Sequence, residues 1–158
     1  MKRLHLHLHV ADLAASQNFY ERLFGSAPTR RETDYAKWML EDPPLNFAIS
    51  TGGQGRTGID HVGIQVDDAA ELAALKARGL AAAAAIADEG RTDCCYARSD
   101  KHWVIDPQGL AWEHFHTLHD IEGFGARPQA ATDDATPAKA AGCCAARTHA
   151  PASAAGCC

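Results

Sequence analysis

A strict alternation of apolar and polar residues opens the chain. Leucine and histidine alternate from Leu4 to His9, and Val10 follows. Successive side chains of a β-strand point to opposite faces, so the leucines share one face and His5, His7 and His9 share the other. We therefore expect a strand with one apolar face and one histidine face.

A helix is expected directly after this strand. Asp12 can cap its first turn, and Gly25 stands where a left-handed residue ends a helix. Extended segments are then expected at 35–40 and 45–50, separated by Asp42-Pro43-Pro44. The apolar residues of the helix recur at helical spacing: Leu13, Phe19, Tyr20, Leu23 and Phe24.

The same order of elements begins again after a glycine-rich link at 51–58. A strand is expected from Ile59 to Val66, and a helix from Ala69 to Arg78 that stops at Gly79. When 5–12 is laid over 61–68 at a constant offset, His5 matches His61 and Asp12 matches Asp68. The chain therefore contains an internal repeat.

The second half ends with three further extended segments. They are expected at 92–98, at 102–105 and, after a turn at 106–109, at 111–117. Asp100-Lys101 is expected to lie in a mobile loop. The segment 81–87 is open, because its alanines favour a helix while its place in the repeat requires a strand.

These elements predict an α+β fold of two tandem βαβββ modules around one cavity. The modules span about 3–50 and 59–118, within a domain at 1–120. Residues 125–158 are rich in Ala, Thr and Pro and have few large apolar side chains, which predicts a flexible, disordered C-terminal tail.

Charge and composition exclude several classes of function. The net charge is -5 and the 15 basic residues are spread thinly, so nucleic acid is not an expected partner. The N-terminus has no continuous apolar stretch, and we expect a cytoplasmic protein without a membrane partner. Six cysteines form three adjacent pairs rather than a disulfide framework, which indicates reduced thiols.

A metal site is predicted from the repeat. Matching positions on the first strands of two modules face each other across a pseudo-twofold axis, which selects His5 and His61. Glu113, between aromatic residues in the last strand, is the third expected ligand. The segment 45–50 contains no His, Asp or Glu, so open positions remain, which suits non-haem Fe(II) that binds dioxygen.

The other histidines are interpreted as structural. His7 and His9 match a glycine and a glutamine in the repeat, and His114 and His116 alternate with Glu113 and so point the other way. His7 remains the substitute first ligand if the register of the repeat is different.

The adjacent thiols Cys94 and Cys95 offer two sulfurs to one soft acceptor. A soft atom with two exchangeable positions can therefore be held by both thiolates. The alternative is that both cysteines are small buried hydrophobic residues in a strand.

The chain resembles a known superfamily. Residues 18–25 (NFYERLFG), 60–66 (DHVGIQV) and 106–113 (DPQGLAWE) are similar to the glyoxalase, bleomycin-resistance and extradiol-dioxygenase superfamily. The resemblance covers roughly residues 3–118. It implies the vicinal oxygen chelate fold and the position of the metal, but not the reaction.

A narrower resemblance comes from 35–37 (YAK), 44–47 (PLNF) and 92–104 (TDCCYARSDKHWV). These residues are similar to the arsenic-inducible carbon-arsenic lyases and the related cadmium-induced proteins. The resemblance implies Fe(II) at His5, His61 and Glu113, and binding of trivalent organoarsenicals, methyl or aryl, by Cys94 and Cys95. It implies dioxygen-dependent cleavage of the carbon–arsenic bond, with release of arsenite.

Two alternatives to this enzyme are carried forward. One is a thiol-based protein that binds cadmium or arsenite without turnover, and the other, disfavoured by the missing carboxylate at 45–50, is a glyoxalase-type isomerase. Members of the superfamily often form dimers, and the sequence leaves a homodimer open. Thiols for capture and delivery of arsenicals are expected in the tail, at Cys143, Cys144, Cys157 and Cys158.

Overall fold

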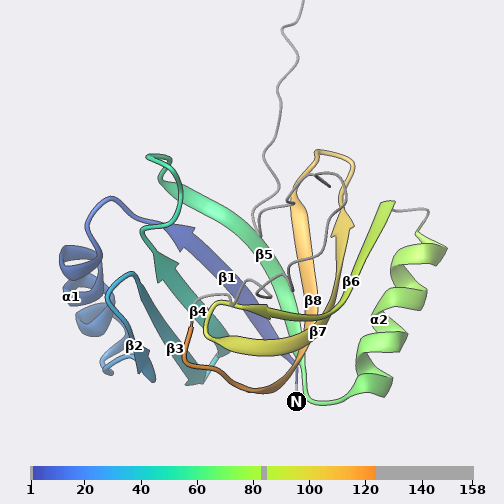
Figure 1. Cartoon of the computed structure of the whole chain (residues 1–158), viewed down its shortest axis with the longest axis horizontal. Coiled ribbons are helices and arrows are strands. Elements are labelled where there is room, and N and C mark those ends of the chain that lie inside the picture. The colour runs from blue at the N-terminus through green and yellow to red at the C-terminus, as the bar shows by residue number, and fades with distance from the viewer. Residues whose placement is uncertain (1, 83–84, 124–158) are drawn as a thin grey trace, which may run out of the picture. The chain divides into compact units, whose positions relative to one another are not determined.

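The computed structural model of the chain describes residues 2–82 and 85–123. These residues form an eight-stranded mixed sheet and two helices (Figure 1). The tail predicted at 125–158, with Cys143, Cys144, Cys157 and Cys158, lies outside the described residues.

Each half of the chain has the same order of elements. The first module comprises β1 (Arg3–His9), α1 (Leu13–Phe24), β2 (Arg30–Arg31), β3 (Tyr35–Glu41) and β4 (Pro44–Ser50). The second comprises β5 (Gly58–Val66), α2 (Ala69–Ala81), β6 (Ala85–Cys94), β7 (Ala97–Ile105) and β8 (Ala111–Asp120). The predicted α+β fold with two βαβββ modules is confirmed.

The sheet joins the modules through their first strands. The strand order is β2-β3-β4-β1-β5-β8-β7-β6, and β1 pairs antiparallel with β5. In this pairing His5 lies opposite Gly63, and His61 lies opposite His7. These two pairs are related by a pseudo-twofold axis at the pair of Leu6 and Val62, so the register predicted from the repeat is present.

The apolar core lies between the sheet and the helices. In the first module, Trp38 and Phe47 are buried against Tyr20 and Phe24 of α1, and the rings of Tyr20 and Phe47 are 4.5 Å apart. In the second module, Val66 packs with leucines of α2. The leucine face of β1 contributes to the first of these cores, as its alternation predicts.

The opposite face of the sheet is polar and also buried. His5, His7 and His9 of β1 are each no more than 6% exposed, although they point away from α1. Buried polar groups require hydrogen-bond partners or ligands. The face opposite the helices is therefore where the functional site is found.

The ends of the helices follow the prediction in part. Asp12 accepts a hydrogen bond from the backbone N–H of Ala15, and Gly25 has a left-handed φ of 66°. The predicted stop at Gly79 is wrong, because α2 continues to Ala81. A Cβ at Gly79 would approach Ile86 to 3.2 Å, so this glycine allows close packing rather than ending the helix.

Two predictions for the second module need correction. The segment 92–98 is not one strand, because β6 and β7 meet in a tight turn at Cys95 and Tyr96. Asp100 and Lys101 do not lie in a loop but within β7, where Lys101 is buried. Of the open segment 81–87, Ala81 is helical and the residues from Ala85 onward are strand.

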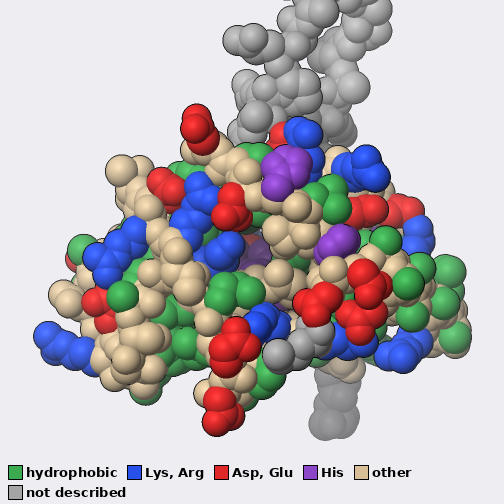
Figure 2. Space-filling view, turned by 90° about the horizontal axis from the view of Figure 1, so that it is seen from below, with side chains coloured by type: hydrophobic (Ala, Val, Ile, Leu, Met, Phe, Trp, Pro, Cys, Tyr) green, Lys and Arg blue, Asp and Glu red, His purple; other side chains and the backbone are tan. Residues whose placement is uncertain are grey.

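Acidic and basic side chains are intermixed over the face seen in Figure 2. Within residues 2–82 and 85–123, no helix is long and apolar enough to cross a membrane.

Candidate metal and thiol site

A cavity of about 50 Å³ lies on the polar face of the sheet. Both modules line it, because β1, β3 and β4 contribute residues from one side and β5 to β8 from the other. Its walls include all five residues predicted for the site: His5, His61, Cys94, Cys95 and Glu113. The structure therefore brings together side chains that are up to 108 residues apart in the chain, from His5 to Glu113.

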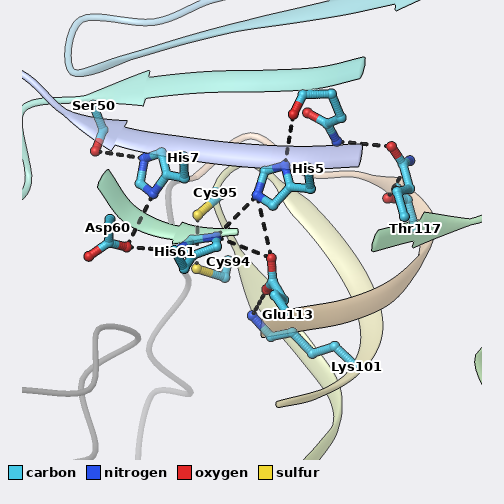
Figure 3. A network of polar contacts seen from close by, with 12 residues as sticks. His5, His7, Ser50, Asp60, His61, Cys94, Cys95, Lys101, Glu113 and Thr117 are labelled. Carbon is cyan, nitrogen blue, oxygen red and sulfur yellow. Dashed lines mark hydrogen bonds and ion pairs between the residues drawn. The ribbon is translucent and has the colours of Figure 1, made fainter. Parts of the chain in front are cut away.

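Three of these residues converge on one point (Figure 3). The Nε2 atoms of His5 and His61 are 3.1 Å apart. Glu113 Oε2 lies 3.5 Å from Nε2 of His5 and 3.3 Å from Nε2 of His61. One donor atom of each side chain thus forms a corner of a nearly equilateral triangle.

The imidazole of His5 is oriented by the neighbouring strand. Its Nδ1 lies 3.0 Å from the backbone oxygen of Asn46 in β4. A carbonyl oxygen only accepts, so Nδ1 carries the proton and donates it. In this tautomer the lone pair of Nε2 faces the cavity, as a metal ligand requires.

Asp60 orients the second imidazole. The pairing of β1 with β5 shifts between His7 and Leu8, so that Asp60 is an extra, bulged residue. Its carboxylate accepts a hydrogen bond from Nδ1 of His61 over 2.7 Å. Carboxylate–histidine pairs of this kind fix the ring of a metal ligand. Asp60 was not among the residues predicted for the site.

The carboxylate of Glu113 has two different neighbours. Oε2 faces the two imidazoles, whereas Oε1 accepts a hydrogen bond from Nζ of Lys101 over 3.0 Å. Both side chains are buried. A buried carboxylate is stable in the charged form only with such partners.

The pKa values of the three donor side chains are shifted in different directions. Burial lowers the pKa of His5 to about 3. Burial also opposes the charged form of His61, but hydrogen bonds to Asp60 and Glu113 outweigh it and raise the pKa of His61 to about 9. Burial would raise the pKa of Glu113, yet His61 and Lys101 hold it well below its usual range. Burial thus favours the neutral form of His5, whereas the neighbouring carboxylates favour the charged form of His61.

The triad fits a divalent metal ion. Ligand atoms about 2.1 Å from one ion lie roughly 3.0–3.4 Å apart at angles between octahedral and tetrahedral. Two of the observed separations, 3.1 and 3.3 Å, lie within this range, and the third, 3.5 Å, is slightly longer. Two imidazoles and one carboxylate are the donor set of non-haem Fe(II) oxygenases, which keep open positions.

The first module supplies no counterpart of Glu113. Glu113 pairs with Gly63 of β5, and the residue that pairs with His7 in the same way on β1 is Ala48 of β4. Ala48 is buried and lines the cavity. The fourth-ligand position is thus a methyl group, as expected from the absence of His, Asp and Glu at 45–50.

His7 and His9 surround the carboxylate of Asp60. Nδ1 of His7 is 3.3 Å from Asp60 Oδ2, and Nε2 of His9 is 3.1 Å from Asp60 Oδ1. The other ring nitrogen of each lies about 3 Å from Oγ of Ser50, at 3.0 Å for His7 and 3.1 Å for His9. His7, Asp60 and His61 do form a second group of donors within 4.8 Å. Because the contacts with Asp60 and Ser50 engage both ring nitrogens of His7, we interpret it as support for Asp60.

The remaining predicted structural histidines lie away from the cavity. His114 contacts His102 on the neighbouring strand, with 3.1 Å between ring nitrogens. Glu113, Phe115 and Thr117 line the cavity, whereas His114 and His116 do not. This alternation along β8 follows the prediction.

The two cysteines lie at the β6–β7 turn. Their sulfurs are 3.1 Å apart, well beyond the roughly 2.05 Å of a disulfide, so both are thiols. Cys95 and Tyr96 have φ values of 55° and 63°. This turn needs positive φ at both central positions, which Asn and Gly provide more easily than Cys and Tyr.

The turn is held over the cavity by residues of the first module. The hydroxyl of Tyr96 donates to Asp34 over 2.6 Å, and Arg30 donates to the backbone oxygen of Tyr96 over 3.0 Å. The ring of Tyr96 also lies 5.6 Å from that of Tyr35. Cys94 and Cys95 therefore line the same cavity as the triad (Figure 3).

The fold and this arrangement define a superfamily. The profile of the Glyoxalase/Bleomycin resistance protein/Dioxygenase superfamily matches residues 2–114, and the chain belongs to this superfamily. The fold is shared with a Mn(II)-bound glyoxalase from Novosphingobium aromaticivorans: the TM-score is 0.56 at 18% identity, over 83% of this chain and 44% of that one. For an extradiol ring-cleaving dioxygenase from B. fuscum the TM-score is 0.57 at 19% identity, over 76% and 34%.

Sequence similarity narrows the family. The chain is 38% identical, over 91% of both chains, to the trivalent organoarsenical cleaving enzyme of Bacillus sp. (strain MD1). It is 38% identical, over 91% of this chain and 93% of the other, to cadmium-induced protein CadI of Mycobacterium bovis. The chain thus belongs to the family that contains these two proteins, as the resemblance in the sequence implies.

Proposed function

We propose that this chain is a non-haem Fe(II)-dependent dioxygenase that cleaves the carbon–arsenic bond of trivalent organoarsenicals, methyl or aryl, and yields arsenite. The observation that carries the proposal is one cavity lined by both the His5–His61–Glu113 triad and the Cys94–Cys95 pair. The relatives named as trivalent organoarsenical cleaving enzymes support the same substrate class.

In this proposal the triad holds Fe(II), which would supply the electrons that make dioxygen reactive. His5 and His61 are fixed in their ring orientation by Asn46 and Asp60. Glu113 offers one oxygen, and Ala48 leaves the first-module side of the site without a further ligand. The residues of the chain thus position the metal and keep part of its surroundings open.

Cys94 and Cys95 take up the arsenical by thiol exchange. Two S–H groups replace the two hydroxyls of an organoarsenous acid, so that two As–S bonds form and two waters leave. Arsenic stays trivalent and keeps its carbon substituent. Because the two sulfurs lie 3.1 Å apart, one soft atom can bridge them.

In the cleavage step, one dioxygen supplies the oxygen atoms that are added and accepts the electrons that are released. For a methyl arsenical, one dioxygen converts methylarsenous acid to formaldehyde and arsenous acid. Carbon loses the electrons that dioxygen gains, and the carbon–arsenic bond is replaced by an oxygen–arsenic bond. The reaction therefore needs no further reductant.

The test begins with anaerobic loading of Fe(II), followed by trivalent methylarsenic and then oxygen, with arsenic species resolved by chromatography. Arsenite should form with the native chain and with the His119→Gln variant, whose side chain is exposed. It should not form with Cys95→Ser, with His61→Gln or with Zn(II) in place of Fe(II). Turnover by a zinc-loaded, iron-free sample would contradict the mechanism.

A second function is favoured by one observation, the 38% identity to cadmium-induced protein CadI. It is thiol-based binding of cadmium or arsenite without turnover. The same experiment separates the two functions, because sequestration leaves methylarsenic intact, bound to the protein and stoichiometric with the chain.

A further inference from the structure

We infer that Lys101 is a positioning residue that restricts Glu113 to a single metal bond through Oε2. The inference rests on the proposed metal site. It adds a residue that the sequence motifs do not assign to the site, and it addresses how many positions around the metal stay open for dioxygen and substrate.

The contacts of Glu113 divide its two oxygens between two tasks. Oε2 is the atom that faces the imidazoles, at 3.5 and 3.3 Å. Oε1 is held by the ammonium of Lys101 at 3.0 Å, away from that point (Figure 3). For the carboxylate to bind a metal through both oxygens, Oε1 would have to leave a buried, charge-assisted hydrogen bond.

The position of Lys101 is itself firmly set. Its side chain is 4% exposed, and its Nζ lies 5.6 Å from the centre of the Trp103 ring. In the β7–β8 pairing Trp103 lies opposite Glu113, which places Lys101 diagonally beside that carboxylate. Glu89, in the irregular part of β6, is a second and more exposed carboxylate at 3.5 Å from Nζ.

This ammonium should act on the metal in two ways. A six-coordinate ion with three protein donors keeps three open positions, whereas a bidentate Glu113 would leave two. The positive charge of Lys101 also opposes a nearby divalent cation. Lys101 therefore favours open coordination at the expense of metal affinity.

If Lys101 had only a structural role, its removal would change the metal affinity in the opposite direction. If Lys101 served only to neutralise Glu113 and hold β7 against β8, its removal would loosen the triad and weaken metal binding. The sign of the change in metal affinity thus distinguishes the two roles.

The experiment compares Lys101→Met, Lys101→Arg, Lys76→Met and His61→Gln in the full chain. Lys76 forms an ion pair with Asp88 on the surface of the same module and serves as the matched control. The measurements are the dissociation constant for Co(II) under anaerobic conditions, the visible absorption of bound Co(II), which reports coordination number, and turnover with Fe(II).

Lys101→Met should bind Co(II) more tightly, by roughly tenfold. Its Co(II) spectrum should shift toward higher protein coordination, and turnover should fall at least tenfold. Lys101→Arg keeps the charge and a donor to Oε1, so its spectrum and turnover should stay close to those of the native chain. Lys76→Met should match the native chain in all three measurements.

Weaker Co(II) binding by Lys101→Met, or an unchanged spectrum, would overturn the inference. Failure of the proposed metal site gives a different pattern. In that case the native chain and His61→Gln would have the same Co(II) affinity, whatever the behaviour of Lys101→Met.

Discussion

A single inserted residue creates much of the environment of His61. Asp60 is the bulged residue of β5, and its carboxylate faces three histidines: His7, His9 and His61. A regular strand would direct adjacent side chains to opposite faces. The bulge therefore allows Asp60 to lie behind the imidazole that follows it in the chain.

Replacement of Asp60 by Asn should weaken metal binding. The amide keeps the size of the side chain but loses the charge that fixes the His61 ring, and such supporting partners contribute about 10–100-fold in metal affinity. Competition with a metal indicator measures the change. The matched control is Asp42→Asn, at an exposed position, and an equal affinity of both variants would contradict this role of Asp60.

The left-handed backbone of Cys95 predicts that glycine at this position favours the stability of the fold but removes a thiol needed to capture an arsenical. A non-glycine residue in this conformation costs roughly 1–2 kcal/mol, which glycine avoids. Cys95→Gly should therefore be about 1 kcal/mol more stable to urea than Cys95→Ala, while neither variant captures an arsenical through two thiols. Equal stability of the two variants would show that the turn is unstrained.

Among the elements, the first strands and the helices were predictable because their apolar periodicity is regular. The β6–β7 turn was not, since Cys95-Tyr96 lacks the Asn or Gly that marks such turns. Missing that turn also placed Lys101 in a loop. The sequence did indicate the turn at 106–109. This turn folds β8 back on β7 and so brings Glu113 beside Lys101.

The pairing of β7 with β8 also predicts a pH dependence of stability. Burial lowers the pKa of His102, which lies against His114. The unfolded chain takes up a proton below about pH 6.5 that the folded state resists, so this contribution is complete above that pH and is lost as the pH falls.

Urea unfolding at pH 7.5 and 5.5 checks this contribution. The loss of stability should be smaller in His102→Gln than in the native chain, by at most about 1.4 kcal/mol per pH unit. The exposed His119→Gln should lose as much stability as the native chain. An identical loss in His102→Gln would contradict the assignment.

At the scale of the whole molecule, the repeat made the candidate ligands predictable. Of the nine histidines, the repeat selects His5 and His61, and the structure brings both to Glu113. Lys101 and Asp60 could not be selected in the same way. The role of Asp60 depends on a bulge, which leaves no mark in the hydrophobic pattern, and that of Lys101 depends on the β6–β7 turn.

The thiols beyond residue 125 predict a kinetic effect of the tail. We propose that Cys143, Cys144, Cys157 and Cys158 capture arsenicals and pass them to Cys94 and Cys95 by exchange. A chain that ends at residue 125 should turn over more slowly when the arsenical is scarce, and at the native rate when it is saturating. An unchanged rate at low concentration would contradict delivery.

The methyl group of Ala48 has a consequence for how such a protein can diversify. In the proposed site the first half of the molecule supplies only His5 to the metal, so most of its cavity wall is released from the demands of coordination. Mutations there can reshape the space for the organic substituent while the inorganic chemistry stays intact. Changes of substrate range within this lineage should therefore accumulate on β3 and β4, and the opposite wall should drift little.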